Sequence, residues 1–177
     1  MAKPDYTLYL VTDEPEAYAT NLFDGVDAAI AGGVTMVQYR ATKGSGRFLY
    51  ETAKTLCERL RTHSIPLIIN DRLDLALAVD ADGLHLGQND IPVDVARRLL
   101  GKQAILGLSI TDPEQLDAVD FDLVDYIGAG PVYSTATKAD AAPAIGLEVL
   151  AGITRRSKVP VVAIGGIHHS NAKAVFD

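Results

Sequence analysis

Two carboxylates that end apolar, strand-like runs are the residues of this chain best suited to metal chemistry. Asp71 closes residues 68–71, and Asp90 closes residues 83–90. Because each Asp stands where a strand pattern stops, we expect both to project from one rim of a sheet. Mg²⁺ takes oxygen ligands and usually keeps water or substrate phosphate as its others. Taken singly, either Asp fits a helix N-cap better than a metal site, but their joint position on adjacent strands favours Mg²⁺.

Side chains suited to binding phosphate end another strand-like run. Gln38-Tyr39-Arg40 closes that run, and Lys43 follows it in an expected loop. The guanidinium group of arginine offers a fork of donors that fits a phosphate bidentately, and lysine adds a mobile point charge. From these residues alone, a phosphate site and an ordinary solvated loop are equally open.

A third group of polar residues lies in the segment 130–138. Thr135, Thr137 and Lys138 follow one another closely there, and their hydroxyl and ammonium groups are able to hold the oxygens of a phosphate. The small, turn-rich residues 139–144 come next. We interpret them as a mobile lid, since long loops are more often functional than accidental.

A glycine pair, Gly165-Gly166, closes the last apolar run before an expected helix. Glycines at such a point let backbone N–H groups approach an anion at a helix N-terminus. Barrel enzymes often bind phosphate in the loops after their seventh and eighth strands. The same pair also fits a simple tight turn, so both interpretations stay open.

Short apolar runs alternate with amphipathic segments along the whole chain. Strands are predicted at residues 7–12, 35–40, 66–71, 83–87, 105–109, 125–130 and 159–164. Helices are predicted at 22–31, 48–61, from 73, at 93–100, behind a capping box of Thr111 and Glu114, at 147–156 and after Ser170. Regular strand–helix repeats of this kind indicate a parallel sheet.

The distribution of polar and glycine residues distinguishes a barrel from an open sheet. They follow nearly every predicted strand, whereas an open sheet concentrates its ligand at one switch point. We therefore predict the α/β class and a (β/α)₈ TIM barrel in one domain, residues 1–177. Seven strands are counted and a typical barrel has about 250 residues. We accordingly expect the domain to be C-terminally incomplete, lacking the eighth strand and the final helix.

Composition and charge exclude several classes of function. The net charge is −7 and no basic tract occurs, which argues against binding nucleic acid through a broad positive face. No apolar run is long enough to span a membrane, and the N-terminus lacks the apolar core of a signal peptide. The single Cys57 is expected to be a small buried hydrophobe and His85 a packed core histidine. A cytoplasmic enzyme fits these features.

Five segments together resemble the thiamine phosphate synthase family, in the order in which that family has them. They are residues 38–40, 69–71, 85–90, 130–138 and 164–167, and the resemblance runs from about Tyr9 to the end of the chain. It implies a (β/α)₈ barrel that joins hydroxymethylpyrimidine diphosphate to hydroxyethylthiazole phosphate. The products are thiamine phosphate and pyrophosphate, and the departure of diphosphate through a pyrimidine carbocation is assisted by Mg²⁺.

The resemblance also implies a role for each matching residue. Asp71 and Asp90 would bind Mg²⁺, while Arg40, Ser109 and Lys138 would take part in catalysis. The pyrimidine diphosphate would be held by Gln38, Arg40, Lys43, Asn70, Ser109 and Lys138, and the thiazole phosphate by Thr135, Thr137 and the N–H of Gly166. The chain departs from the family's usual Arg-x-Lys spacing at Arg40 and Lys43.

Two other functions are open alongside this one. A thiazole tautomerase-like isomerase would share the fold, although both Asp residues, Arg40 and the segment 135–138 argue against it. The expected missing strand suggests a truncated, non-catalytic phosphate-binding relic. The expected partners are the two small-molecule substrates, with neither nucleic acid nor membrane, and an oligomer is compatible with the sequence.

Overall fold

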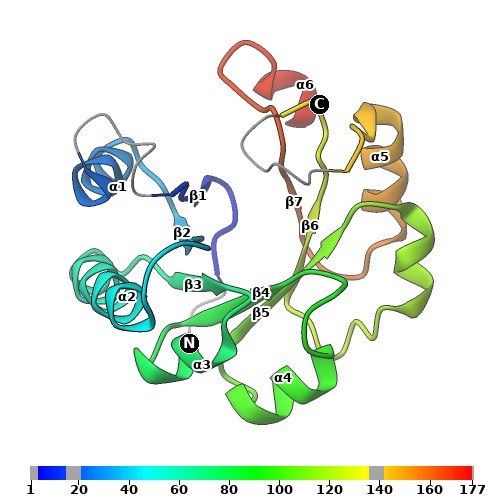
Figure 1. Ribbon diagram of the computed structural model, residues 1–177. Coiled ribbons are helices and arrows are strands. Elements are labelled where there is room, and N and C mark those ends of the chain that lie inside the picture. The colour runs from blue at the N-terminus through cyan, green and yellow to red at the C-terminus, as the bar shows by residue number, and fades with distance from the viewer. Residues whose placement is uncertain (1–3, 15–20, 136–141, 177) are drawn as a thin grey trace. The chain divides into compact units, whose positions relative to one another are not determined.

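A computed structural model describes residues 4–14, 21–135 and 142–176 (Figure 1). The chain divides into two compact units. The first comprises Met1–His85 with Asp94–Ile105, and the second comprises Leu86–Val93 with Leu106–Asp177. Parallel strands alternate with helices along the chain, as the apolar runs predict.

The strands of the first unit pair in the order in which they occur. They are β1 (Tyr9–Val11), β2 (Met36–Tyr39), β3 (Leu67–Asn70) and β4 (Gly83–Leu86). All pairings are parallel, and the register sets Gln38 beside Val11 and Ile68. Because neighbouring parallel strands end at the same level, the residues that follow β2 and β3 share one edge of this sheet.

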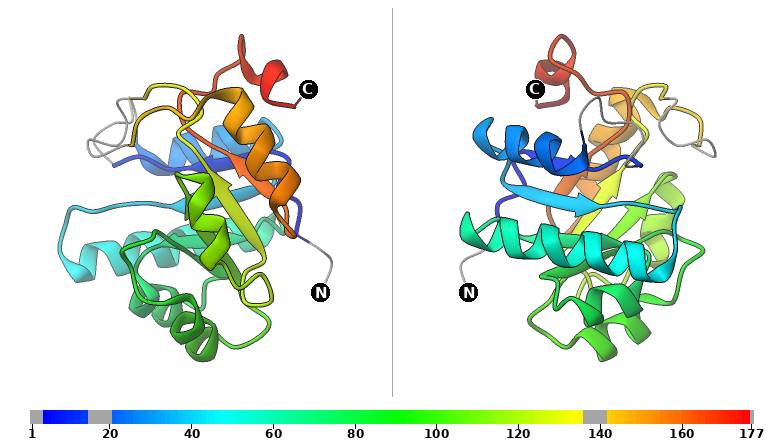
Figure 2. Two further views of the ribbon diagram at one scale, coloured as in Figure 1. Left: turned by 90° about the vertical axis from the view of Figure 1, so that its right-hand side faces the viewer. Right: turned by 60° about the vertical axis from the view of Figure 1, so that its left-hand side comes forward.

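The helices of the first unit lie where the sequence predicts. They are α1 (Leu22–Ala31), α2 (Gly46–Thr62), α3 (Leu73–Ala78) and α4 (Val93–Leu100). Both bounds match for α1 and α4, whereas α2 starts two residues earlier and ends one residue later than predicted. The side chain of Asn21 caps α1 by accepting from the Asp24 N–H, and Gly33, at φ 91°, follows its C-cap. Ser45 caps α2 in the same way. Both helices lie along β1–β3 (Figure 2).

The apolar stripe of α2 is buried as its periodicity predicts. Leu49, Ala53, Leu56 and Leu60 all lie in the core. Cys57 is buried beside them, and burial raises the pKa of its thiol. The prediction of a small buried hydrophobe at this position is confirmed.

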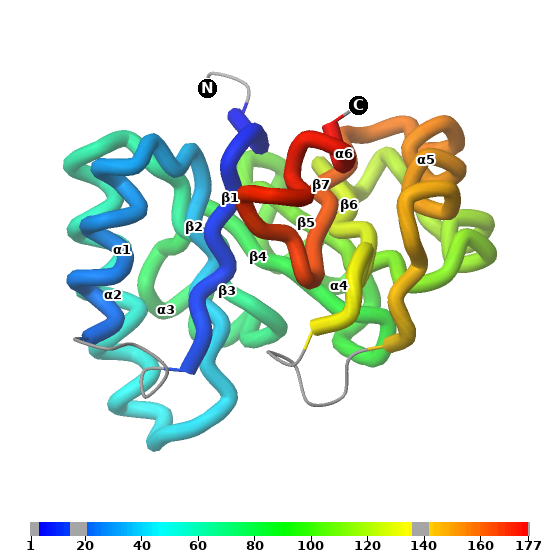
Figure 3. Tube along the Cα trace, turned by 90° about the horizontal axis from the view of Figure 1, so that it is seen from above, coloured from blue at the N-terminus to red at the C-terminus, as the bar shows by residue number. Residues whose placement is uncertain are grey.

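The second unit holds the remaining strands and helices. They are β5 (Ile105–Ile110), the 3₁₀ helix η2 (Pro113–Ala118), β6 (Tyr126–Ala129), α5 (Gly146–Arg156), β7 (Val161–Ala163) and α6 (Ala172–Phe176). The three strands are parallel in the order β5-β6-β7, and α5 lies alongside β6 and β7 (Figure 3). No helix in the described part of the chain is long and apolar enough to cross a bilayer.

The predicted helix start after β5 is wrong by one residue. Asp112, rather than Thr111, is the N-cap and accepts from the Glu114 N–H at 2.8 Å. Gln115, rather than Glu114, returns the second bond of the capping box. The reason is Pro113, whose fixed φ suits the first helical position, so that the residue before it becomes the cap.

Candidate functional site

The amide of Gln38 is fixed at the end of β2. The residue is only 5% exposed, and its Nε2 donates to the phenol oxygen of Tyr9 at 3.0 Å. Tyr9 opens the neighbouring strand β1, so the sheet itself orients this predicted substrate-binding side chain.

Arg40 follows β2 and has its backbone anchored by a buried threonine. Its N–H donates to Thr12 Oγ1 at 3.0 Å, and the same hydroxyl lies 3.5 Å from the Arg40 carbonyl oxygen as a donor. Thr12 is 2% exposed. The guanidinium group of Arg40 therefore extends from a backbone that is held on both of its polar atoms.

The loop that carries Lys43 is held by a carboxylate from the segment after β1. Glu14 Oε1 accepts from the Thr42 N–H at 2.9 Å and from the Thr42 hydroxyl at 2.5 Å. Burial raises the pKa of Glu14, but hydrogen bonds from Thr42 and Lys43, together with the charge of Lys43, outweigh burial and leave this pKa below its ordinary value. Lys43 itself is exposed.

Asn70 and Asp71 mark the end of β3. Asn70 is half-buried and pairs in register with His85. Asp71 has a positive φ of 61° and donates its N–H to the His85 carbonyl at 2.8 Å; Asp is among the few residues that tolerate this conformation. The N-cap of α3 is Arg72 and has no side-chain capping bond. Asp71 is therefore not the N-cap residue of α3, and it is exposed at the strand end.

His85 has the environment predicted for a core histidine. It lies inside β4 and is 7% exposed. Its backbone contributes to the site by accepting the Asp71 N–H.

Asp90 closes the turn that follows β4 in the second unit. Its Oδ2 accepts from the Gly87 N–H at 2.6 Å, and the residue is exposed. Gln88 of the same turn donates from Nε2 to the Ser109 carbonyl oxygen at 2.7 Å. Ser109 is half-buried in β5. The turn therefore connects the predicted metal ligand Asp90 to the strand that carries Ser109.

The turn at Gly165-Gly166 packs directly against the loop that leads to Thr135. The Tyr133 N–H donates to the Gly165 carbonyl at 3.0 Å. A Cβ built on Gly166 would lie 2.6 Å from the Ser134 carbonyl oxygen, which only glycine avoids. Gly166 and the residue before Thr135 are thus in contact, as a shared phosphate site requires. Thr137 and Lys138 lie outside the described residues.

The two predicted metal ligands, Asp71 and Asp90, are carboxylates that follow two different strands. Among residues 4–14, 21–135 and 142–176, no group of three or more His, Cys, Asp or Glu side chains is arranged to hold an ion. A hard ion bound by two carboxylates and substrate phosphates needs no such group.

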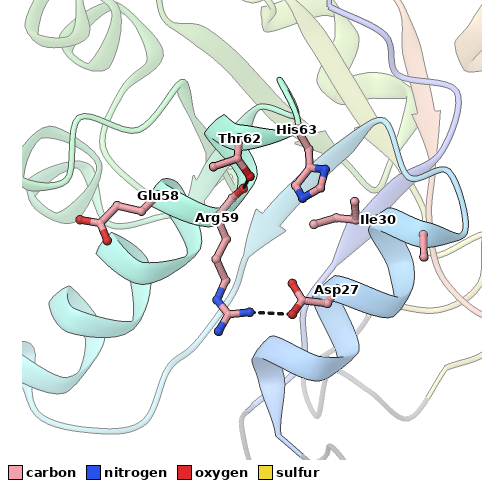
Figure 4. Close-up of a pocket in the computed structure, with 7 residues that line it drawn as sticks. Asp27, Ile30, Glu58, Arg59, Thr62 and His63 are labelled. Carbon is pink, nitrogen blue, oxygen red and sulfur yellow. Dashed lines mark hydrogen bonds and ion pairs between the residues drawn. The ribbon is translucent and has the colours of Figure 1, made fainter.

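A surface groove in the first unit contains none of the predicted site residues (Figure 4). It lies between α1 and α2 and includes Asp27, Arg59 and His63. Arg59 donates to Asp27 at 2.6 Å and lies 5.0 Å from the ring centre of Phe23. The groove is near the C-terminal ends of these helices, which precede the starts of β2 and β3. These contacts account for it as a seam between packed helices.

Three polar residues near the predicted site were not identified from the sequence. Thr12 and Glu14 hold the backbone at Arg40 and Thr42, and Asn171 Nδ2 donates to the Gly166 carbonyl at 2.9 Å. Thr12 follows a strand-like run, which is the same signal that identified Asp71 and Arg40. Glu14 and Asn171 lie in loops whose partners the sequence does not indicate.

Comparison with known proteins gives consistent results over the length of the chain. A family model described as thiamine monophosphate synthase matches residues 8–177. A thiamine-phosphate synthase of Syntrophomonas wolfei is 53% identical over 175 residues, covering 99% of this chain and 84% of that protein. One from Azorhizobium caulinodans is 47% identical over 172 residues, covering 97% and 81%.

A solved structure shares the fold as well as the sequence. The thiamine phosphate pyrophosphorylase of Pyrococcus furiosus matches with a TM-score of 0.86 and 37% identity, over 98% of this chain and 82% of that one. The predicted α/β barrel fold and the predicted transferase activity are confirmed by these relatives. The chain belongs to the thiamine monophosphate synthase family.

Proposed function

We propose that this protein condenses hydroxymethylpyrimidine diphosphate with hydroxyethylthiazole phosphate, using Mg²⁺ and the strand-end residues described above. The C–O bond between the pyrimidine methylene carbon and the diphosphate breaks, and pyrophosphate leaves with the bonding electrons. The thiazole nitrogen then gives its lone pair to that carbon and forms the new C–N bond. The names of the relatives support this reaction.

The observation that carries the residue assignments is the anchoring of Arg40 directly after β2. Thr12 fixes the backbone from which the guanidinium group extends, which limits the region where that group can meet a diphosphate. Gln38, Lys43 and Asn70 complete the set proposed to hold the pyrimidine diphosphate. Placing positive charge opposite a departing diphosphate stabilises the charge that develops on it.

The carboxylates of Asp71 and Asp90 would hold Mg²⁺, which when bound supplies charge to the leaving diphosphate. Both are exposed oxygen donors at the ends of consecutive strands, which suits an ion that keeps water and phosphate ligands. Asp90 uses Oδ2 for the Gly87 N–H, an arrangement that orients its other oxygen.

In the second unit, Thr135, Thr137 and the Gly166 N–H are proposed to bind the thiazole phosphate. The contact between the Gly166 turn and the carbonyl of Ser134 supports this for two of the three. Ser109 and Lys138 are proposed to face the pyrimidine substrate and to take part in its ionisation.

A coupled assay for pyrophosphate tests the proposal. Release should require both substrates and Mg²⁺ together. An isomerase acting on a thiazole phosphate carboxylate would release no pyrophosphate, so that outcome would favour the tautomerase-like alternative. Binding of phosphate compounds without turnover would favour a non-catalytic protein.

The assignment of the metal ligand is tested with Asp90→Asn. Loss of the carboxylate charge should lower turnover at limiting Mg²⁺ by at least the roughly 10–100-fold found when groups that support a metal's ligands are removed, with partial recovery as Mg²⁺ is raised. Asp94→Asn is a matched control, since it removes an exposed carboxylate from the first turn of α4. Equal Mg²⁺ dependence in both variants would contradict the role of Asp90.

A further inference from the structure

Two side chains from the segment after β1 form hydrogen bonds with the segment after β2. Thr12 binds the N–H and the carbonyl oxygen of Arg40, and Glu14 binds the N–H and the hydroxyl of Thr42. The backbone of Thr12 also joins the two segments, because its N–H donates to the Gln38 carbonyl at 2.9 Å. Four side-chain contacts are therefore made within three residues of the β2–α2 loop.

The character of these contacts differs along the loop. Thr12 is buried and neutral, and it acts where the loop leaves the sheet. Glu14 is half-buried and charged, and it acts two residues later, immediately before the exposed Lys43. The loop continues to Ser45, whose hydroxyl caps α2 by accepting from the Phe48 N–H at 3.2 Å. Glu14 thus binds the middle of a loop that the sheet and the helix hold at its ends.

We propose that Glu14 is a positioning residue that holds the β2–α2 loop in place, so that Arg40 and Lys43 meet the diphosphate of the pyrimidine substrate. This inference rests on the proposed function, because it takes the diphosphate to be the ligand of Arg40 and Lys43. Glu14 acts through its bonds to Thr42 and through the charge of Lys43, as a positioning residue rather than a catalytic one. The carboxylate charge of Glu14 attracts Lys43, which is exposed to solvent.

The geometric part of the proposal is tested by hydrogen exchange at the Thr42 amide, which donates to Glu14 Oε1. Glu14→Ala should speed this exchange about tenfold, since a hydrogen bond to a charged acceptor is lost. Glu14→Gln keeps an acceptor oxygen and should lie between Glu14→Ala and the unsubstituted protein. Glu51→Gln is the matched control, because it removes an exposed carboxylate from α2. Unchanged exchange in Glu14→Ala would overturn the proposal.

The functional part is tested by the KM for each substrate in the same variants. Glu14→Ala should raise the KM for the pyrimidine diphosphate about tenfold and leave that for the thiazole phosphate unchanged, with Glu14→Gln giving partial rescue. A purely structural role would instead lower the unfolding temperature and reduce activity without favouring either substrate.

The role of Glu14 in holding the loop and the role of the loop in binding substrate can be contradicted independently. If the Thr42 amide exchanges faster while the KM for the pyrimidine diphosphate stays constant, the loop does not serve that substrate and the proposal is overturned. If the unsubstituted protein releases no pyrophosphate, the proposed function fails, and the exchange rates still decide whether Glu14 holds the loop.

Discussion

Two loops of this protein are proposed to bind phosphate groups, and they are held in different ways. The β2–α2 loop of the first unit is held by the side chains of Thr12 and Glu14, which lie in the segment that follows β1. The Gly165-Gly166 turn of the second unit is held chiefly by backbone contacts with residues 131–134, to which Asn171 adds one side-chain bond at the Gly166 carbonyl. A loop held by side chains can be loosened by truncating one of them or by protonating a carboxylate. A loop held by backbone fails when a side chain is added.

The largest expected effect is on the backbone-held turn. A Cβ on Gly165, which has φ 99°, would lie 2.4 Å from Pro131 Cβ and 2.5 Å from Pro131 Cα. Gly165→Ala should therefore lower the free energy of unfolding by about 2–5 kcal/mol, from the left-handed conformation and the overlap together.

Gly33→Ala separates these two contributions. Gly33 also has a positive φ, of 91°, but nothing lies within 4 Å of its added Cβ. Its substitution should cost about 1–2 kcal/mol from conformation alone. Equal losses in the two variants, measured by denaturant unfolding, would show that backbone packing is not what holds the Gly165 turn.

A smaller effect is expected from the buried side chain on the other loop. Thr12→Val keeps the shape of the residue and leaves the Arg40 N–H without its acceptor, at a cost of about 1–3 kcal/mol. The KM for the pyrimidine diphosphate should rise, while the KM for the thiazole phosphate should hold steady. Thr55→Val is a suitable control, since the Thr55 hydroxyl bonds only within α2, to the Glu51 carbonyl.

The smallest effect is a dependence on pH that only the side-chain-held loop should show. The pKa of Glu14 lies below its ordinary value of 4.5 in the folded protein. Its stabilising contribution is therefore complete above pH 4.5 and is lost as pH falls through the lowered folded pKa.

Unfolding free energies of the unsubstituted protein and Glu14→Gln give the measurement. The difference between them should be constant near neutral pH and should shrink as the pH falls below 4.5. A difference that stays constant through the acidic range would mean that the charge of Glu14 does not hold the loop.

Much of the fold can be predicted from local sequence patterns, such as apolar spacing and residues that end helices. The bounds of α1 and α4 match those predicted from apolar spacing, because each helix is followed by a glycine with positive φ, Gly33 and Gly101, which is a local signal. The predicted start of η2 is wrong by one residue because Thr111, Asp112 and Pro113 stand together, and the prediction gave no weight to proline's preference for the first helical position.

The candidate site was predictable only in part, for a physical reason. Residues that directly follow strands, such as Arg40 and Asp71, are found because parallel strands end at one edge. Glu14 and Thr42 are 28 residues apart, and their contact depends on how two loops lie together. No periodicity or motif indicates a contact between residues so far apart in the sequence. Residues that position a site, such as Glu14, are therefore harder to predict than proposed ligand-binding residues such as Arg40.

The two loops are proposed to serve different substrates, and the KM values of two variants decide whether they do. Arg40→Ala should raise the KM for the pyrimidine diphosphate alone, and Gly166→Ala, whose Cβ would meet the Ser134 carbonyl, should raise the KM for the thiazole phosphate alone. Unfolding curves confirm that each variant is folded before it is assayed. Equal rises of both KM values in either variant would show that the loops do not divide the two substrates between them.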